Sequence, residues 1–190
     1  MDASTYKESI DLYKNKLLNH LNSVSLISPP NFNSFPIDCR QIDSFKEKKY
    51  KALVEKGVLD GDTPYIYYFK LASKCDKKAL INEIQIFKSS EDNSKALKLP
   101  LVHGHFDSDI LYVGKSQGDF LTRTKVHFGF TGDKTYGLHL KKWFDIIGIS
   151  PDLTLQFYYA PIEVKDENLV ELIESSLHLK LKPILGRSGH

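Results

Sequence analysis

The chain has few cysteines and no long apolar run. Only two of its 190 residues are cysteine, Cys39 and Cys75, and they lie in unrelated contexts without the spacing of a metal-binding motif. The opening residues, MDASTYKESIDLYKNK, are polar and include acids, so they lack the basic and apolar regions of a secretory signal peptide. No apolar stretch approaches the roughly 20 residues that a bilayer-spanning helix needs. These absences argue against a disulfide scaffold and a transmembrane helix, and we expect a reduced, cytoplasmic setting.

A strong net charge is also missing. The chain has 26 Lys and Arg residues against 24 Asp and Glu, a formal charge of +2, so composition alone gives no argument for a nucleic-acid partner. The hydrophobic fraction of 41% and the charged fraction of 26% fit an ordinary globular domain with its own core. Lysines cluster at residues 46–51 and again from Lys180 to Arg187. A lysine cluster is usually a solvated helix face, so neither cluster indicates a binding surface by itself.

Hydrophobic periodicity predicts several helices. Residues 5–22 space apolar side chains at intervals of three and four, which is typical of an amphipathic helix. Residues 28–36, SPPNFNSFP, combine prolines with Asn and Ser and therefore predict a loop. Further helices are expected in the following segments: 42–56, 77–88, 118–128, 138–147, and a last one after the N-cap Asp166.

Three short β-branched and aromatic runs predict strands, at residues 65–69, 109–113 and 153–159. The order of these elements indicates an α/β (α+β) fold with a small mixed central sheet of about three strands, flanked by helices.

Four short motifs carry residues suited to chemistry. Tyr65-Ile66-Tyr67 begins one predicted strand, and Tyr112-Val113-Gly114-Lys115 ends another. Arg123 and His127 are four residues apart, so they share one helix face. Glu174 lies on the last helix, nine residues before Pro183.

In this order the four motifs resemble the GIY-YIG nuclease family, and the Arg-x-x-x-His pair is similar to restriction enzymes within it. The resemblance covers roughly residues 62–190, with an insertion at about 71–108. It extends to a stretch seen in some members after the arginine helix, which implies packing against the sheet for Tyr136, Leu138, His139, Leu140 and Trp143. It implies a catalytic domain over 62–190, preceded by an N-terminal helical arm at 1–61 for target recognition or dimerisation. Two positions depart from the pattern. Tyr65 replaces the glycine of GIY, and the family's late asparagine falls on Gly186, so its support is expected from Arg187 or Ser188.

The resemblance implies a metal-dependent endonuclease. A phosphodiester is protected by its own charge, so Glu174 is expected to hold Mg²⁺ or Mn²⁺, and Arg123 to bind the scissile phosphate. Either Tyr67 or His127 activates the attacking water, with Tyr112 as second partner. His127 is better matched to neutral pH, because a free tyrosine has a pKa of about 10.

The same resemblance implies double-stranded DNA as the substrate. Lys115, Lys182 and Arg187 are expected to bind its phosphates. A restriction or phage-defence role follows by resemblance only. A homodimer is expected, since an enzyme with one site per chain needs two copies to cut both strands.

Other interpretations of these residues remain open. Tyrosines in strands are more often packing residues than catalytic ones, an Arg–His pair can be an exposed helix pair, and Glu174 can be solvated. Two other classes are therefore a catalytically weakened nucleic-acid-binding module, which Gly186 favours, and a protein-interaction domain. His103, His105 and Asp107 form a weaker candidate metal site without an evident fourth ligand.

Overall fold

The computed structural model describes residues 31–42, 63–72, 75–90, 97–143, 147, 153–164 and 166–186, and part of the segment 7–19. The chain divides into two compact units, Met1–Pro30 and Asn31–His190. In the first unit the described residues of 7–19 are helical, as predicted, and their side chains are exposed. Beyond Ile42, the helix expected at 42–56 lies outside the described residues, as does the lysine cluster at 46–51.

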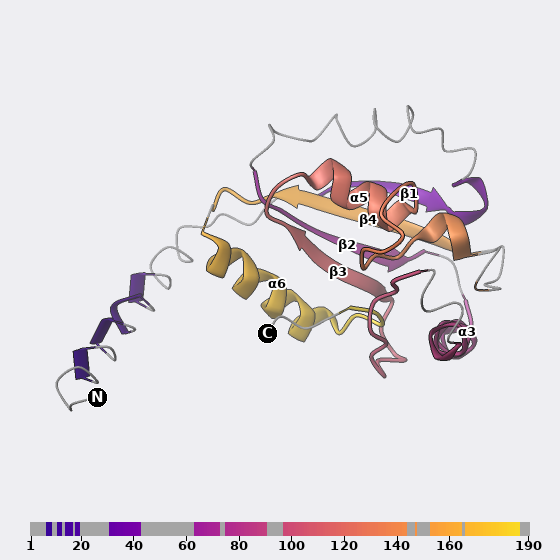
Figure 1. Cartoon of the computed structure of the whole chain (residues 1–190), viewed down its shortest axis with the longest axis horizontal. Coiled ribbons are helices and arrows are strands. Elements are labelled where there is room, and N and C mark those ends of the chain that lie inside the picture. Colours follow the sequence, from indigo (N-terminus) through magenta and orange to yellow (C-terminus); the bar gives the residue numbers. More distant parts are fainter. Residues whose placement is uncertain are drawn as a thin grey trace. The chain divides into compact units, whose positions relative to one another are not determined.

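The second unit is built on an antiparallel sheet of four strands, where about three were expected (Figure 1). The strands are β1 (Asn33–Asp38), β2 (Tyr65–Leu71), β3 (Ile110–Ser116) and β4 (Thr154–Pro161). Their order across the sheet is β1-β4-β2-β3, so β3, which carries the second tyrosine motif, lies at an edge.

Strand β1 corrects the loop expected at residues 28–36. The prolines of this segment indicated a loop, but Phe35 and Ile37 are buried and alternate with more exposed neighbours. Pro36 cannot donate a backbone hydrogen bond, and β1 is the other edge strand, where this is tolerated. β1 also precedes residue 62, the expected start of the catalytic domain, yet it belongs to the same sheet as the motif strands.

In the described part of this unit, three α-helices accompany the sheet near the predicted positions. They are α3 (Lys77–Ser89), α5 (Phe120–Phe128) and α6 (Glu167–Leu181). Each begins after an aspartate, Asp76, Asp119 or Asp166, whose carboxylate accepts backbone N–H groups of the first turn. The segment expected as a helix at 138–147 contains the 3-10 helix η2 (Leu140–Lys142), and residues 144–146 lie outside the described part.

The two faces of the sheet carry different cores. Tyr65, Tyr67 and Phe69 of β2 belong to the larger apolar cluster, which includes α3 and α5. Ile66 belongs to a smaller cluster with Val170 of α6. Because neighbouring residues of a strand point to opposite faces, α5 and α6 cover opposite faces of the sheet (Figure 1). Motifs on the two helices can therefore meet only across the edge strand β3.

Candidate active site

The two motif tyrosines lie on the α5 face of the sheet, close to Gly114. Tyr67 pairs with Gly114, and Phe69 pairs with Tyr112, so both tyrosine rings point to the same face. A Cβ atom on Gly114 would lie 2.7 Å from the Tyr67 hydroxyl oxygen and 2.7 Å from the Tyr112 ring. Glycine is therefore required here for the two rings to converge on the edge strand.

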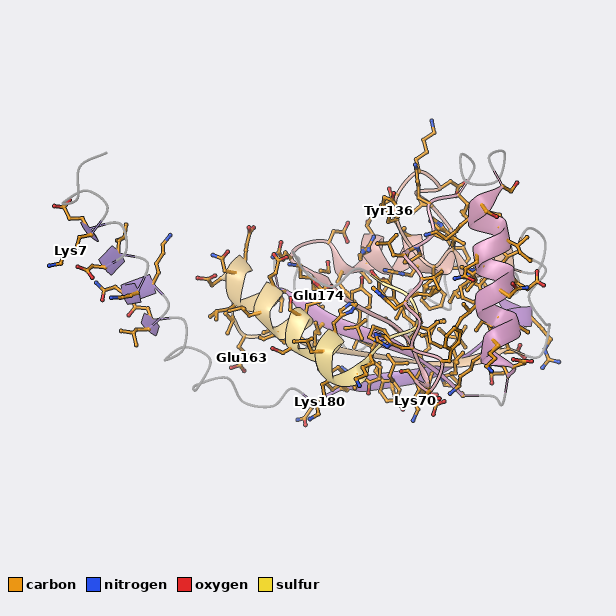
Figure 2. All side chains as sticks on the ribbon, turned by 90° about the horizontal axis from the view of Figure 1, so that it is seen from below. Lys7, Lys70, Tyr136, Glu163, Glu174 and Lys180 are labelled. Carbon is orange, nitrogen blue, oxygen red and sulfur yellow. The ribbon has the colours of Figure 1, made fainter. Side chains whose placement is uncertain are left out.

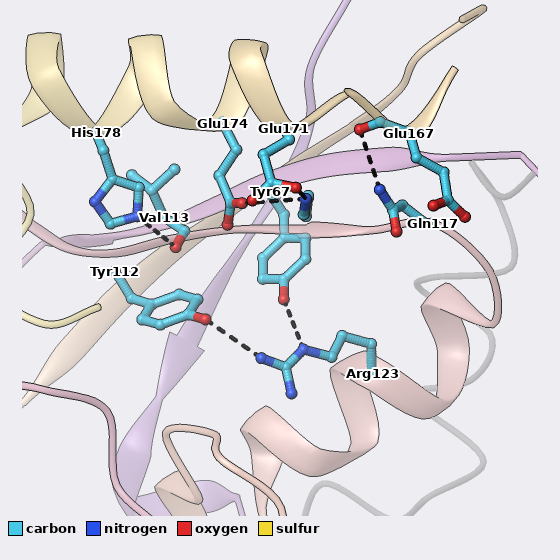
Figure 3. Close-up of polar contacts among 10 residues, drawn as sticks. Tyr67, Tyr112, Val113, Gln117, Arg123, Glu167, Glu171, Glu174 and His178 are labelled. Atoms are coloured by element: carbon cyan, nitrogen blue, oxygen red, sulfur yellow. Dashed lines mark hydrogen bonds and ion pairs between the residues drawn. The ribbon is translucent and has the colours of Figure 1, made fainter. Parts of the chain in front are cut away.

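Arg123 of α5 joins the two tyrosines. Its Nε donates to the Tyr67 hydroxyl oxygen at 3.1 Å and its Nη2 to the Tyr112 hydroxyl oxygen at 3.3 Å (Figure 3). Its Nη1 donates to the backbone carbonyl of Tyr136 at 2.7 Å. Burial alone would lower the pKa of Arg123, but the neighbouring Tyr67 and Tyr112 oxygens raise it above its ordinary value. The guanidinium is thus charged and held by hydrogen bonds to three residues.

His127 is buried one turn further along α5. Its Nδ1 accepts the backbone N–H of Leu138 at 3.2 Å, so the proton of the neutral ring lies on Nε2. This Nε2–H donates to the Tyr67 hydroxyl oxygen at 2.9 Å. Burial, followed by the charge of Arg123, lowers the pKa of His127 well below its ordinary value. The ring is therefore neutral and a donor, and in this arrangement its Nε2 cannot accept a proton.

The hydrogen bonds of this cluster have a direction. Tyr67 accepts from Arg123 and from His127, so its own hydroxyl hydrogen is left to donate, and Arg123 also donates to the Tyr112 hydroxyl oxygen. Burial raises the pKa of Tyr112, while Arg123 and the Tyr67 hydroxyl lower it. Within the described part of the chain, the hydroxyl hydrogen of Tyr112 has no acceptor.

The tyrosines and the histidine of this cluster differ in solvent exposure. Tyr67 and His127 each have 0% exposure, whereas Tyr112 keeps 8%. Neither candidate for the water-activating base is therefore accessible to solvent in this structure. Arg123 links Tyr67 to Tyr112, and the hydrogen-bonded cluster is least enclosed at Tyr112, on the edge strand.

Glu174 approaches from α6, on the other face of the sheet (Figures 2 and 3). Its side chain is 13% exposed, and the Lys115 ammonium lies 3.9 Å from its carboxylate. The same ammonium lies 3.0 Å from the carboxylate of Glu171. Burial raises the pKa of Glu174 to about 7, and Lys115 and Arg123 lower it. Since Arg123 acts on this carboxyl, the guanidinium and Glu174 belong to one electrostatic site across the edge strand.

We refer to Tyr67, Tyr112, Arg123, His127 and Glu174 as the edge-strand site.

The carboxylates of this site fit one kind of metal ion. The described residues include no group of three or more His, Cys, Asp and Glu side chains that could enclose a metal. Mg²⁺ retains several waters and commonly needs only one or two carboxylates. Glu174 and its neighbour Glu171, one helical turn apart, fit such a hydrated ion and do not fit a closed zinc site.

The candidate residues of the HGHFD segment lie in a different environment. His103 hydrogen-bonds to the carbonyl oxygen of Gly186 at 3.0 Å, and its ring centroid lies 6.0 Å from that of His105. Asp107 is exposed. These contacts give His103 a packing role at the end of the chain's described part.

An asparagine, which the resemblance predicts at this position, could not replace Gly186 without rearrangement. Its φ is +147°, and a Cβ atom would lie 2.7 Å from Cε1 of His178. The buried ring of His178 occupies this space. His178 lies one turn after Glu174 on α6, and its Nε2 is 3.3 Å from the Val113 carbonyl oxygen. His178 therefore ties the helix that carries Glu174 to the edge strand.

Lys182, one of the expected phosphate-binding residues, lies away from this cluster. Lys182 is exposed at the end of α6, eight residues and roughly 12 Å along the helix axis from Glu174. Arg187 and Ser188 lie outside the described residues. Lys115 does lie in the cluster, where it pairs with the two glutamates.

Sequence reasoning did not identify Glu171, His178 or Tyr136 as parts of the site. The spacing of Glu171 and Glu174, i and i+3 on a helix, is a signal that could have identified the first. Leu138, His139, Leu140 and Trp143 are buried, as expected, but Tyr136 is 59% exposed and does not pack against the sheet. No pattern in the sequence marks this difference.

Comparison of the chain with family models, curated proteins and solved structures gives no match. None of the helices in the described part of the chain is both long and apolar enough to traverse a membrane. Function is therefore inferred from the geometry of the edge-strand site.

Proposed function

We propose that this chain is a divalent-metal-dependent endonuclease of the GIY-YIG type, which hydrolyses phosphodiester bonds in DNA with Mg²⁺ or Mn²⁺. The observation that supports it best is the position of the Arg123 guanidinium. It donates to both motif tyrosines and lowers the pKa of Glu174, although these residues are far apart in the sequence. The Arg123 guanidinium is permanently charged and can bind a phosphodiester and neutralise its charge, which must happen before a nucleophile can attack. The partly buried Glu174 carboxylate lies in the same site.

Arg123 keeps the capacity to bind a phosphate. A guanidinium has five N–H groups, and three are used by Tyr67, Tyr112 and the Tyr136 carbonyl. Two N–H groups remain, one on each terminal nitrogen, and both can donate to phosphate oxygens. The tyrosines thus orient the guanidinium and leave two of its N–H donors available.

Tyr112 is the tyrosine best placed to meet the attacking water. Tyr67 and His127 are enclosed, and their hydrogen bonds connect them to the more exposed Tyr112 through Arg123. We therefore assign positioning roles to Tyr67 and His127, and contact with water to Tyr112. A Mg²⁺ ion held by Glu174 would polarise the phosphoryl oxygen and lower the pKa of a bound water.

The test is cleavage of plasmid and phage DNA by the purified protein with Mg²⁺ or Mn²⁺, with EDTA as the metal-free control. Glu174→Gln should reduce cleavage at least about 100-fold. Glu163→Gln, an exposed glutamate before α6, should cut like the wild type. Undiminished cutting by Glu174→Gln would remove Glu174 as the metal ligand.

A catalytically weakened nucleic-acid-binding module is the second candidate. Gly186 has no side chain to support the site, and Tyr67 and His127 have no exposed surface. This function predicts DNA binding that weakens steeply with salt, but no metal-dependent cutting of any substrate. A cytoplasmic location, a homodimer and a restriction or phage-defence role remain predictions of the resemblance.

A further inference from the structure

Tyr136 shows a large aromatic face beside the edge-strand site. Its backbone carbonyl accepts a hydrogen bond from Nη1 of Arg123 at 2.7 Å, so residue 136 borders the site (Figure 2 labels Tyr136). Tyr136 is 59% exposed, and no hydrogen bond of its hydroxyl is found in the described part of the chain. An exposed tyrosine is common and needs no explanation by itself. The backbone of this tyrosine, however, contacts Arg123, the cation of the site.

The loop that carries Tyr136 is held in place. The Lys98 N–H donates to the Asp133 carbonyl at 3.2 Å, and the Gly137 N–H donates to the Lys98 carbonyl at 3.0 Å. A hydrogen bond from the Thr135 N–H to the Gly132 carbonyl oxygen, at 2.6 Å, closes a turn in this loop. The ring is therefore presented from an anchored backbone, which lowers the entropy lost when a ligand stacks on it.

Positive charge accompanies the ring. The Lys98 ammonium lies over the ring of Tyr136, 5.9 Å from its centroid. Lys134 is exposed on the same loop, and the carboxylate of Asp133 pairs with Lys142. An aromatic face next to a lysine matches a nucleic-acid strand, in which base faces alternate with phosphates.

We propose that Tyr136 and Lys98 form a subsite for one unpaired nucleotide, in which Tyr136 stacks on the base and Lys98 binds the adjacent phosphate. The inference rests on the proposed function, since it names the form of nucleic acid that enters the same site. Bases within an intact duplex are stacked on each other and have no free face for the ring. The substrate class is therefore DNA with a single-stranded, bulged or flipped nucleotide beside the scissile phosphate, where the cost of unstacking is least.

The test measures binding by the Glu174→Gln protein, so that cleavage does not interfere. The probes are three fluorescein-labelled DNA oligonucleotides: a single strand, a perfect duplex, and the duplex with one unpaired base. Tyr136→Ala should weaken binding to the two probes with an unpaired base about tenfold and to the perfect duplex less than twofold. Tyr136→Phe should retain binding, and Phe106→Ala, another aromatic residue with 44% exposure, should change nothing.

Lys98 is tested by the salt dependence of the same binding. Lys98→Met should reduce the slope of log affinity against log salt by about 0.7, the value for one phosphate contact on a single strand. An equal effect of Tyr136→Ala on all three probes, or no effect on any, would overturn the subsite. This outcome can occur whether or not Glu174-dependent cleavage is found. Conversely, a selective loss with Tyr136→Ala in a protein that never cuts DNA would leave the subsite standing and reject the nuclease.

Discussion

Glu174 is placed where its charge is costly without a cation. The carboxylate is 13% exposed, and the Lys115 ammonium at 3.9 Å offsets the burial only in part. Its pKa is raised to about 7 from an ordinary 4.5, with burial as the largest cause. A bound divalent cation would replace this partial compensation by a full one, so metal binding and proton loss at Glu174 should be linked.

We therefore predict a pH-dependent metal affinity. Below pH 7 a proton competes with Mg²⁺ for Glu174, so the half-saturating Mg²⁺ concentration should rise about tenfold per pH unit and level off above pH 7. Calorimetric titration from pH 5.5 to 8.5 measures this. A pH-independent affinity would show that Glu174 is not the ligand.

The stability of the metal-free protein should depend on the same carboxyl. Its pKa is raised in the folded state, so the folded form binds the proton more tightly than the unfolded chain. This contribution to stability is present below the ordinary pKa and is lost as pH rises through about 7. Thermal melts in EDTA should show that Glu174→Gln gains stability relative to the wild type over this range. A difference in melting temperature that does not change with pH would show that burial does not raise the pKa of Glu174.

His127 should act through Tyr67 and not as a base. His127→Ala removes the donor that orients the Tyr67 hydroxyl, so we expect kcat to fall about 100-fold with KM nearly unchanged. His127→Gln carries an amide N–H that can donate to Tyr67, and it should recover much of the loss. If His127 were the base, both variants would be equally inactive and would lack the acid limb of the pH–rate profile.

At the scale of elements, the site depends on how the edge strand β3 is built. Tyr112 and Gly114 point to the α5 face, and Lys115, the next residue, points to the α6 face. The missing side chain at Gly114 leaves room for the hydroxyl of Tyr67 from the neighbouring strand. One strand therefore brings groups from two helices into a single site.

Gly114→Ala tests this construction. The new Cβ would meet the Tyr67 oxygen and the Tyr112 ring at 2.7 Å, so both rings must shift away from Arg123. We expect a loss of stability of about 1–3 kcal/mol, as for overpacking, and loss of cleavage. Gly118→Ala is the matched control, because nothing lies within 4 Å of a Cβ there. Equal activity of the two variants would argue against convergence of the tyrosines over Gly114.

At the scale of the whole molecule, β1 decides which part of the chain can fold alone. Phe35 and Ile37 of β1 are buried in the larger core and cover β4. Burial of two such side chains contributes roughly 3–6 kcal/mol, which is comparable to the total stability of a small domain.

We therefore predict different behaviour for two shortened chains. A chain starting at Asn31 should melt cooperatively near the temperature of the full chain, because the sheet and both cores lie after this residue. A chain starting at residue 62 lacks β1 and should be largely unfolded or aggregated. Circular dichroism and thermal melts separate the two. A stable chain from residue 62 would restore the domain boundary expected from the sequence.

Local chemistry made several features predictable from the sequence. Asp76, Asp119 and Asp166 cap helices, and β-branched and aromatic runs form β2, β3 and β4, because these signals act over a few residues. The pairing of Arg123 with His127 on one helix face follows from the helical period. Proline misled the prediction at β1, because only the place of a strand in the sheet decides whether a missing N–H matters.

The sequence by itself determined which residues could form the site, through the order of its motifs and the spacing of Arg123 and His127. Only the tertiary structure decided that Tyr67 and His127 are enclosed, that Arg123 links Tyr67 to Tyr112, and that Tyr136 is exposed. The physical reason is that burial, tautomer and pKa depend on neighbours from distant segments. The Leu138 N–H that fixes the His127 tautomer and the edge position of β3 arise only when those segments pack together.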